Sequence, residues 1–175
     1  MTNTRKGRVM ANKLPTKIQF LLADAVRQEA LGKLSLLGLY SGDVILLTGP
    51  LPKTLPEGQQ ALAIPSLAIL ATIMDGHGTF PTTGRLIDPN NKTFAAGPVQ
   101  PVTKTNSGPF NYILPMVPFP VTAFGTYRFE LTIKGKKYTY RFVVRHIDPK
   151  VKLPTKAAAP STSKTKPKLP IKKTR

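Results

Sequence analysis

The sequence contains no cysteine and only two histidines, His77 and His146. Without cysteine the chain can form no disulfide scaffold, no thiolate metal site and no cysteine nucleophile. Two histidines in unlike surroundings are too few for a histidine-rich metal centre. We therefore expect no bound metal and no cofactor.

Long apolar runs are also missing. A membrane span needs roughly 18 uninterrupted apolar residues, and the longest stretch here, 61–74, is interrupted by Pro65 and Ser66. The first 17 residues lack the continuous apolar segment of a secretory signal. We therefore expect a cytoplasmic protein that does not insert into a membrane.

Acidic residues are scarce, with 8 Asp and Glu against 26 Lys and Arg and a formal net charge of +18. The excess lies at the two ends: residues 1–17 carry +5 and residues 149–175 carry +9, both without an acidic residue, whereas residues 18–148 carry +4. Such runs are typical of chains that contact polyanions. The sequence predicts a basic N-terminal extension (1–17), a folded domain (18–148) and a Lys/Pro-rich C-terminal tail (149–175).

One short pattern occurs three times, always outside the predicted domain. Its copies are Lys13-Leu14-Pro15-Thr16-Lys17, Lys152-Leu153-Pro154-Thr155-Lys156 and Lys168-Leu169-Pro170-Ile171-Lys172. Lys and Pro at this spacing favour extended, polyproline-like chain, and residues 157–166 have too few apolar side chains to fold. A chain rich in Lys, Pro and Thr also produces such repeats through composition alone.

Alternation of apolar and polar side chains is clearest at the end of the domain. Residues 127–133 and 138–144 both alternate with period two, and Gly135 and Lys136 separate them, which predicts a β-hairpin with one apolar face. A turn is predicted at 88–92, and a short helical turn is an alternative for 26–31. Further strands are predicted at 18–25, 33–40, 44–47, 66–74, 82–87, 93–96 and 111–117. Many short strands without a long helical period predict an all-β, antiparallel β-sandwich.

Three segments resemble those of a known protein family. They are the run from Phe20 to Tyr40, the motif Leu86-Ile87-Asp88-Pro89-Asn90 and the motif Phe124-Gly125-Thr126-Tyr127-Arg128-Phe129. Over about residues 18–147 the chain resembles an uncharacterised bacterial family of small β-sandwich proteins. The resemblance implies a bacterial or phage origin and an immunoglobulin-like sandwich, here flanked by disordered or extended basic tails. It implies no activity.

Motifs that could support a reaction are weak. Residues 32–35, Gly-Lys-Leu-Ser, resemble the end of a phosphate-binding loop, but the upstream glycine and the following helix are missing, so we interpret them as a turn that enters a strand. Asp75 and His77 could form a general base and its orienting carboxylate, but Gly76 and Gly78 favour a flexible turn. We therefore expect no catalytic residue and no enzymatic activity.

The oxygen-rich segment Asp88, Asn90 and Asn91 offers possible calcium ligands. It lacks the additional acidic ligands of a calcium loop, so we interpret these residues as turn formers. No metal-binding residue is predicted.

Basic side chains are the candidates for nucleic-acid contact. Tyr138, Tyr140 and Phe142 could stack on bases, but their alternation predicts a half-buried hairpin with its basic residues on the other face. The outer-face candidates are Arg128, Arg141 and Arg145, together with Lys134 and opposed only by Glu130. The N-terminal candidates are Arg5, Lys6, Arg8 and Lys13, of which Arg5-Lys6-Gly7-Arg8 resembles a minor-groove arm with Val9 in place of proline. The C-terminal candidates are Lys150, Lys152, Lys156, Lys164, Lys166, Lys168, Lys172, Lys173 and Arg175.

The leading hypothesis from the sequence is a non-enzymatic protein whose basic tails attach it to DNA or RNA with little sequence preference, while the sandwich presents a partner surface. The alternative is a structural or assembly module, for example a phage or secretion-apparatus subunit, whose tails bind an acidic protein partner. An enzyme with an unrecognised site is the third possibility.

Overall fold

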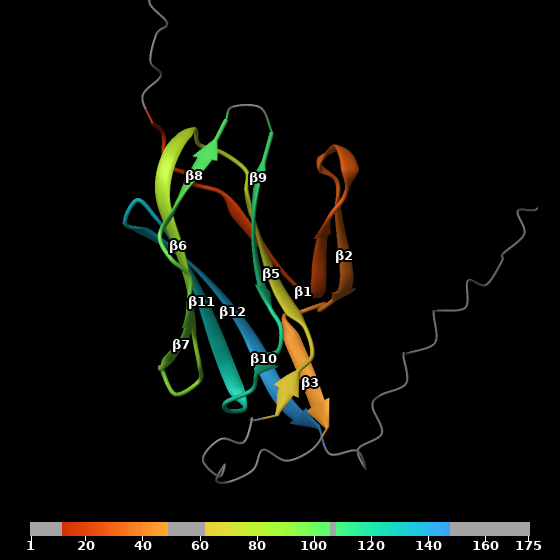
Figure 1. Cartoon of the computed structure of the whole chain (residues 1–175). Coiled ribbons are helices and arrows are strands. Elements are labelled where there is room, and N and C mark those ends of the chain that lie inside the picture. The colour runs from red at the N-terminus through yellow and green to blue at the C-terminus, as the bar shows by residue number, and fades with distance from the viewer. Residues whose placement is uncertain (1–11, 49–61, 106–107, 148–175) are drawn as a thin grey trace, which may run out of the picture.

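The computed structural model describes residues 12–48, 62–105 and 108–147, and within these ranges two β-sheets pack face to face (Figure 1). The smaller sheet has the order β2-β1-β5-β9 and the larger sheet the order β3-β12-β11-β6-β7, with β8 also paired to β6. All strand pairs are antiparallel except β3 and β12. The predicted all-β antiparallel sandwich is confirmed.

The smaller sheet contains β1 (Ile18–Gln28), β2 (Leu34–Leu39), β5 (Leu67–Ile73) and β9 (Phe110–Met116). The larger sheet contains β3 (Val44–Thr48), β6 (Gly78–Ile87), β7 (Thr93–Ala96), β8 (Gln100–Lys104), β11 (Gly125–Ile133) and β12 (Lys136–Ile147). The strands β4 (Ala63–Ile64) and β10 (Phe119–Pro120) pair with each other in a separate two-stranded sheet. A short 3₁₀ helix, η1 (Ala30–Gly32), connects β1 to β2.

The core lies between the two sheets and is rich in aromatic rings. Tyr127, Phe129 and Phe142 are fully buried and come from the alternating positions that the sequence assigns to the apolar face. The Tyr127 and Phe142 rings stack with centroids 5.4 Å apart, and Phe119 packs on both rings. Burial of several large rings supplies much of the free energy that favours the folded state.

A tyrosine corner joins β10 to β11. The Tyr127 hydroxyl donates to the Ala123 carbonyl oxygen at 2.9 Å and accepts from the Thr122 and Ala123 backbone N–H groups at 3.1 and 3.2 Å. A tyrosine near the start of a strand that bonds back to the preceding backbone is a hallmark of immunoglobulin-like sandwiches. The fold is therefore an immunoglobulin-like antiparallel sandwich.

The predicted β11–β12 hairpin is present, but its loop is Lys134-Gly135 rather than the predicted Gly135-Lys136, and Lys136 already belongs to β12. Ile133 pairs with Lys136, and the two loop residues, Lys134 and Gly135, have φ angles of 46° and 80°. Positive φ at both positions is the turn geometry that matches the twist of paired strands, and glycine adopts it readily. The predicted turn at 88–92 is also present, because Asp88 Oδ1 accepts from the backbone N–H groups of Asn90 and Lys92.

Three strands escaped prediction from the sequence. β8 and β10 contain Pro101 and Pro120, and β4 directly precedes Pro65. Proline cannot donate to a strand ladder, so it lowers the strand signal although it is compatible with edge positions such as β8. The helical-turn alternative for 26–31 is correct only for η1, because β1 continues to Gln28 by pairing with β2. No helix among the described residues is long and apolar enough to cross a membrane.

Candidate nucleic-acid interface

The outward side of β6, β11 and β12 carries a cluster of cationic side chains that we call the arginine face. Strand alternation places Arg128 and Glu130 of β11 opposite to the buried Tyr127, Phe129 and Leu131. The members of the arginine face are Arg85, Arg128, Lys137, Arg141 and Arg145, with Glu130 as its acidic residue. The predicted opposition of rings and basic residues is confirmed for Arg128, Arg141 and Arg145, whereas Lys136 lies over the Tyr138 ring.

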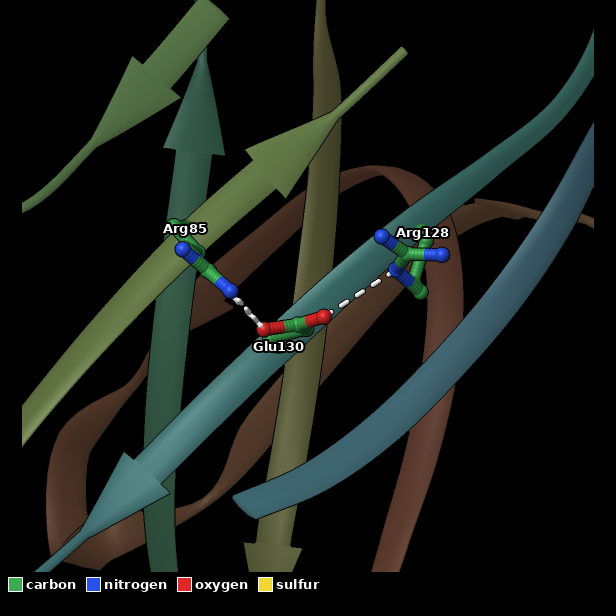
Figure 2. Close-up of polar contacts among 3 residues, drawn as sticks. All are labelled: Arg85, Arg128 and Glu130. Atoms are coloured by element: carbon green, nitrogen blue, oxygen red, sulfur yellow. Dashed lines mark hydrogen bonds and ion pairs between the residues drawn. The ribbon is translucent and has the colours of Figure 1, made fainter. Parts of the chain in front are cut away.

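Glu130 lies between two arginines and binds both (Figure 2). Its Oε2 accepts from Arg85 Nε and Nη2 at 2.8 and 2.6 Å. Its Oε1 lies 3.0 Å from Arg128 Nε, which is buried, but the angle is too poor for a hydrogen bond. The second contact is therefore an ion pair without directional bonding. Hydrogen bonding by Arg85 is the main cause that lowers the pKa of Glu130, so this carboxylate stays ionised.

The remaining cations of the face are less compensated. Arg128 stands directly opposite Arg141 in the β11–β12 register, and two like charges in this position repel each other. Arg141 and Arg145 are exposed, and no carboxylate in the described part of the chain forms an ion pair with either. A phosphate placed over β12 would relieve this repulsion.

The three rings of the hairpin are not available to stack on bases. Tyr140 is 8% exposed and Phe142 is fully buried. Tyr138 is half-buried, with Lys136 Nζ 5.1 Å from its ring centroid and its hydroxyl bonded to Pro15. The stacking alternative is therefore wrong for this hairpin, because the rings belong to the core side of β12.

Of the other basic residues considered as contacts in the sequence, Lys13 and Lys134 lie in the described part of the chain. Lys13 is exposed, and Lys134 lies in the hairpin loop rather than on the arginine face. Lys104, which is not a predicted contact, is unsuited to phosphate binding because it is only 4% exposed and its Nζ donates to the carbonyl oxygens of Thr105 and Gly108, both at 2.6 Å. The predicted contacts that lie outside the described residues are Arg5, Lys6, Arg8, Lys150, Lys152, Lys156, Lys164, Lys166, Lys168, Lys172, Lys173 and Arg175.

In the described part of the chain the Asp75 carboxylate binds Thr16 and Lys17, and no hydrogen bond joins it to His77. Both Asp75 carboxylate oxygens accept hydrogen bonds from Thr16 and Lys17, and the backbone of His77 pairs with Lys13. The predicted turn at 75–78 is packed against residues 13–17. Hydrogen bonds from Thr16 and Lys17 lower the pKa of Asp75 to about 2.

A pocket that the sequence did not reveal lies beside the antiparallel pair of β1 and β2 with η1 between them, which we call the β1–β2 arm. Its volume is about 370 Å³, and it is lined by Asp24, Tyr40, Ile64, Pro65 and Ser66. The Tyr40 hydroxyl donates to Asp24 Oδ1 at 2.5 Å, and burial together with this bond raises the pKa of Tyr40 to about 12. The pocket thus holds one carboxylate, which already has a hydrogen-bond partner. No group of three or more metal-ligating side chains occurs in the described part of the chain.

Two residues of the arginine face, Arg85 and Lys137, were missed as candidates by sequence reasoning. Arg85 joins the cluster only through the pairing of β6 with β11, which places it opposite Glu130.

Neither the scan of protein-family models nor the search of curated proteins finds a match to this chain, so the family resemblance stays a prediction.

Proposed function

We propose that this protein is a non-enzymatic nucleic-acid-binding protein that holds DNA or RNA through its basic ends and through the arginine face of the larger sheet. The observation that carries the proposal is the pair Arg141 and Arg145, exposed on β12 beside Arg128 and without a described carboxylate partner. A row of cations along the open face of a sheet suits contact with a phosphate backbone better than contact with a small ligand.

Binding of this kind works by neutralisation of phosphates and release of counterions, and it is largely blind to base sequence. The 149–175 segment holds eight lysines and one arginine, and lysine acts as a point charge rather than as a bidentate reader of bases. The arginines lie on strands that are paired along their length and would fix the orientation of the sandwich on the nucleic acid. The basic ends would supply most of the affinity.

The test is a titration of a fluorescent DNA duplex with the full chain at several salt concentrations. If roughly 6–10 cations meet phosphates, the affinity should fall by about 10³–10⁵ between 50 and 200 mM salt. The double variant Arg141→Gln/Arg145→Gln should reduce the slope of log affinity against log salt by about 2. A matched control is Arg27→Gln/Lys33→Gln, which removes two exposed cations from the β1–β2 arm and should change the slope much less.

Two outcomes would overturn parts of this proposal. Equal slope changes in the double variant and its control would exclude the arginine face and leave only net charge. Absence of binding by the full chain at low salt would contradict the nucleic-acid proposal and favour an acidic protein partner. A chain that ends at residue 148 lacks nine positive charges and should lose several units of slope.

A structural or assembly module is the second candidate, because the β1–β2 arm presents apolar side chains to solvent. Leu31 is 96% exposed, and Leu37 and Leu39 on β2 are 44% and 55% exposed. β2 pairs only with β1 in the described part of the chain and contains no charged residue. Uncharged edge strands with exposed leucines favour strand addition by a partner. A module of this kind would form complexes without nucleic acid.

A further inference from the structure

Residues 13–17 bind to a surface of the sandwich that we call the seat, which is formed by Asp75, Gly76, His77 and Tyr138. The sequence places residues 13–17 in the basic N-terminal extension. Lys13 and His77 exchange two backbone hydrogen bonds of 2.8 and 3.0 Å, as in a strand added to a sheet. Leu14 packs against the core, and Pro15 is buried. In Figure 1 this stretch lies at the end of the sandwich where β12 begins.

The seat contacts the centre of the pentapeptide through specific groups. The Pro15 carbonyl oxygen accepts from the Tyr138 hydroxyl at 2.5 Å and from Lys136 Nζ at 3.2 Å. Asp75 Oδ2 accepts from the Thr16 hydroxyl at 2.5 Å, and Asp75 Oδ1 accepts from the backbone N–H groups of Thr16 and Lys17, both at 2.8 Å. Backbone bonds hold any extended segment, whereas the buried proline and the threonine hydroxyl select a sequence.

Gly76 gives the seat its close approach to the peptide. Its φ is +86°, and a Cβ at this position would lie 2.7 Å from the Lys13 carbonyl oxygen and 2.9 Å from the Pro15 nitrogen. A side chain at residue 76 would therefore displace the peptide as well as strain the backbone. Asp75, Gly76, His77 and Tyr138 together form a surface shaped to an extended Leu-Pro-Thr segment.

The same five residues recur in the chain at 152–156. We propose that the seat is a recognition site for the Lys-Leu-Pro-Thr-Lys sequence, and that the C-terminal copy, 152–156, of one chain occupies the seat of a second copy of the chain in place of that copy's own residues 13–17. This inference goes beyond the proposed function, because it assigns a protein-protein contact that needs no nucleic acid.

Chain length requires the contact to be intermolecular. The twelve-residue strand β12 starts at Lys136, beside the seat, and ends at Ile147, about 35 Å away at 3.3 Å per residue. Lys152 follows Ile147 by five residues, which span about 18 Å at most even when fully extended. The copy at 152–156 therefore falls short of its own seat and can reach only that of another chain.

The third copy provides a natural control within the same chain. Residues 168–172 are separated from Ile147 by enough chain to reach the seat of the same sandwich, since 21 residues span up to about 75 Å. However, Ile171 replaces the threonine and has no hydroxyl to donate to Asp75. A seat that reads the threonine should therefore bind this copy weakly, whichever chain it comes from.

The resident copy competes with any incoming copy. Because residues 13–17 are tethered to the seat, their effective concentration there is in the millimolar range or above. The copy from a neighbouring chain gains the seat when chains are crowded to a similar local concentration, or when the resident is weakened. The substitutions Leu14→Ala and Thr16→Val weaken the resident without altering Asp75, Gly76, His77 or Tyr138.

The first experiment measures binding of labelled peptides to the full-length Leu14→Ala/Thr16→Val chain at about 150 mM salt by fluorescence anisotropy. The peptide of residues 150–158 should bind at least about tenfold more tightly than its Thr155→Val version, because a hydrogen bond to a carboxylate is lost. The peptide of residues 166–174 carries four lysines against three, yet should bind no better than the Thr155→Val version. Equal binding of all three, or a ranking by charge, would overturn the proposal.

The second experiment asks whether the contact occurs between whole chains. Sedimentation velocity of the Leu14→Ala/Thr16→Val chain should show association that increases with protein concentration. Adding Thr155→Val to this variant should return it to the monomer, and circular dichroism of both variants checks that the sandwich is intact. Association that persists with Thr155→Val would assign self-contact to another surface, such as β2. A monomer at all concentrations would exclude the intermolecular contact.

Discussion

The two faces of the larger sheet differ sharply in chemistry, although the same strands form both, with alternate residues pointing to each face. On β12 the inward side chains Tyr140, Phe142 and Val144 are buried, whereas the outward side chains Arg141 and Arg145 are exposed. The inner face packs against the other sheet. The outer face carries arginines, two of which, Arg141 and Arg145, form no ion pair with a described carboxylate. Stability and binding can therefore be altered separately by changing neighbouring residues.

The largest effect is expected on the inner face. Phe129→Ala and Phe142→Ala should each lower the free energy of unfolding by about 3–5 kcal/mol, because each leaves a cavity beside closely packed rings. Urea denaturation followed by circular dichroism measures the change. Losses below about 1 kcal/mol would mean that the rings are not packed in the core, and the contrast between the faces would disappear.

A smaller effect is expected at Glu130, where the outer face is partly neutralised. Glu130→Gln should lower stability by about 1 kcal/mol near neutral pH, since two arginines lose their shared carboxylate. The pKa of Glu130 is lowered in the folded state, so its contribution is present above pH 4.5, the ordinary value, and is lost as the pH falls through the folded-state pKa. The difference in Tm between wild type and variant should therefore shrink on acidification.

The same Glu130→Gln variant should bind duplex DNA more tightly than the wild type, because Arg85 and Arg128 become available to phosphate. Stability and affinity would then change in opposite directions after a single substitution. A variant that loses affinity along with stability would indicate that Glu130 positions the two arginines for binding rather than occupying them.

The smallest effect is expected for the stability of Arg141→Gln. Removing one of two directly opposed arginines should change the free energy of unfolding by no more than about 0.5 kcal/mol, in the stabilising direction. Because the repulsion is screened by salt, the gain should fade between low and high ionic strength. Thermal melts of wild type and variant at the two ionic strengths test this. Destabilisation above 1 kcal/mol would assign Arg141 a structural role.

Local patterns in the sequence were enough to predict the hairpin and the division of its faces. Period-two alternation fixes which way Phe142 and Arg141 point, and Gly135 marks the loop, so no distant contact is needed. The all-β sandwich follows from the same signal repeated along the chain. The turn at Asp88 was predictable because its side chain bonds to its own backbone neighbours.

Contacts between distant residues could not be predicted in this way. Arg85 and Glu130 are 45 residues apart and meet only through the register of β6 with β11. Thr16 and Asp75 are 59 residues apart, so neither the seat for residues 13–17 nor the packed state of 75–78 could be read from composition. The glycines around His77 suggested mobility, whereas Gly76 lets the peptide backbone approach closely.

The burial of Lys104 has a practical consequence for mapping the surface by chemical labelling. An amine-specific acylating reagent needs an accessible, uncharged lysine amine, and the Lys104 amine is enclosed by the carbonyl groups of Thr105 and Gly108. Lys104 should therefore react only when the sandwich opens, while an exposed lysine such as Lys137 reacts in the folded state. Mass spectrometry of the acylated chain would thus record unfolding at Lys104 and ligand protection at Lys137 in the same sample.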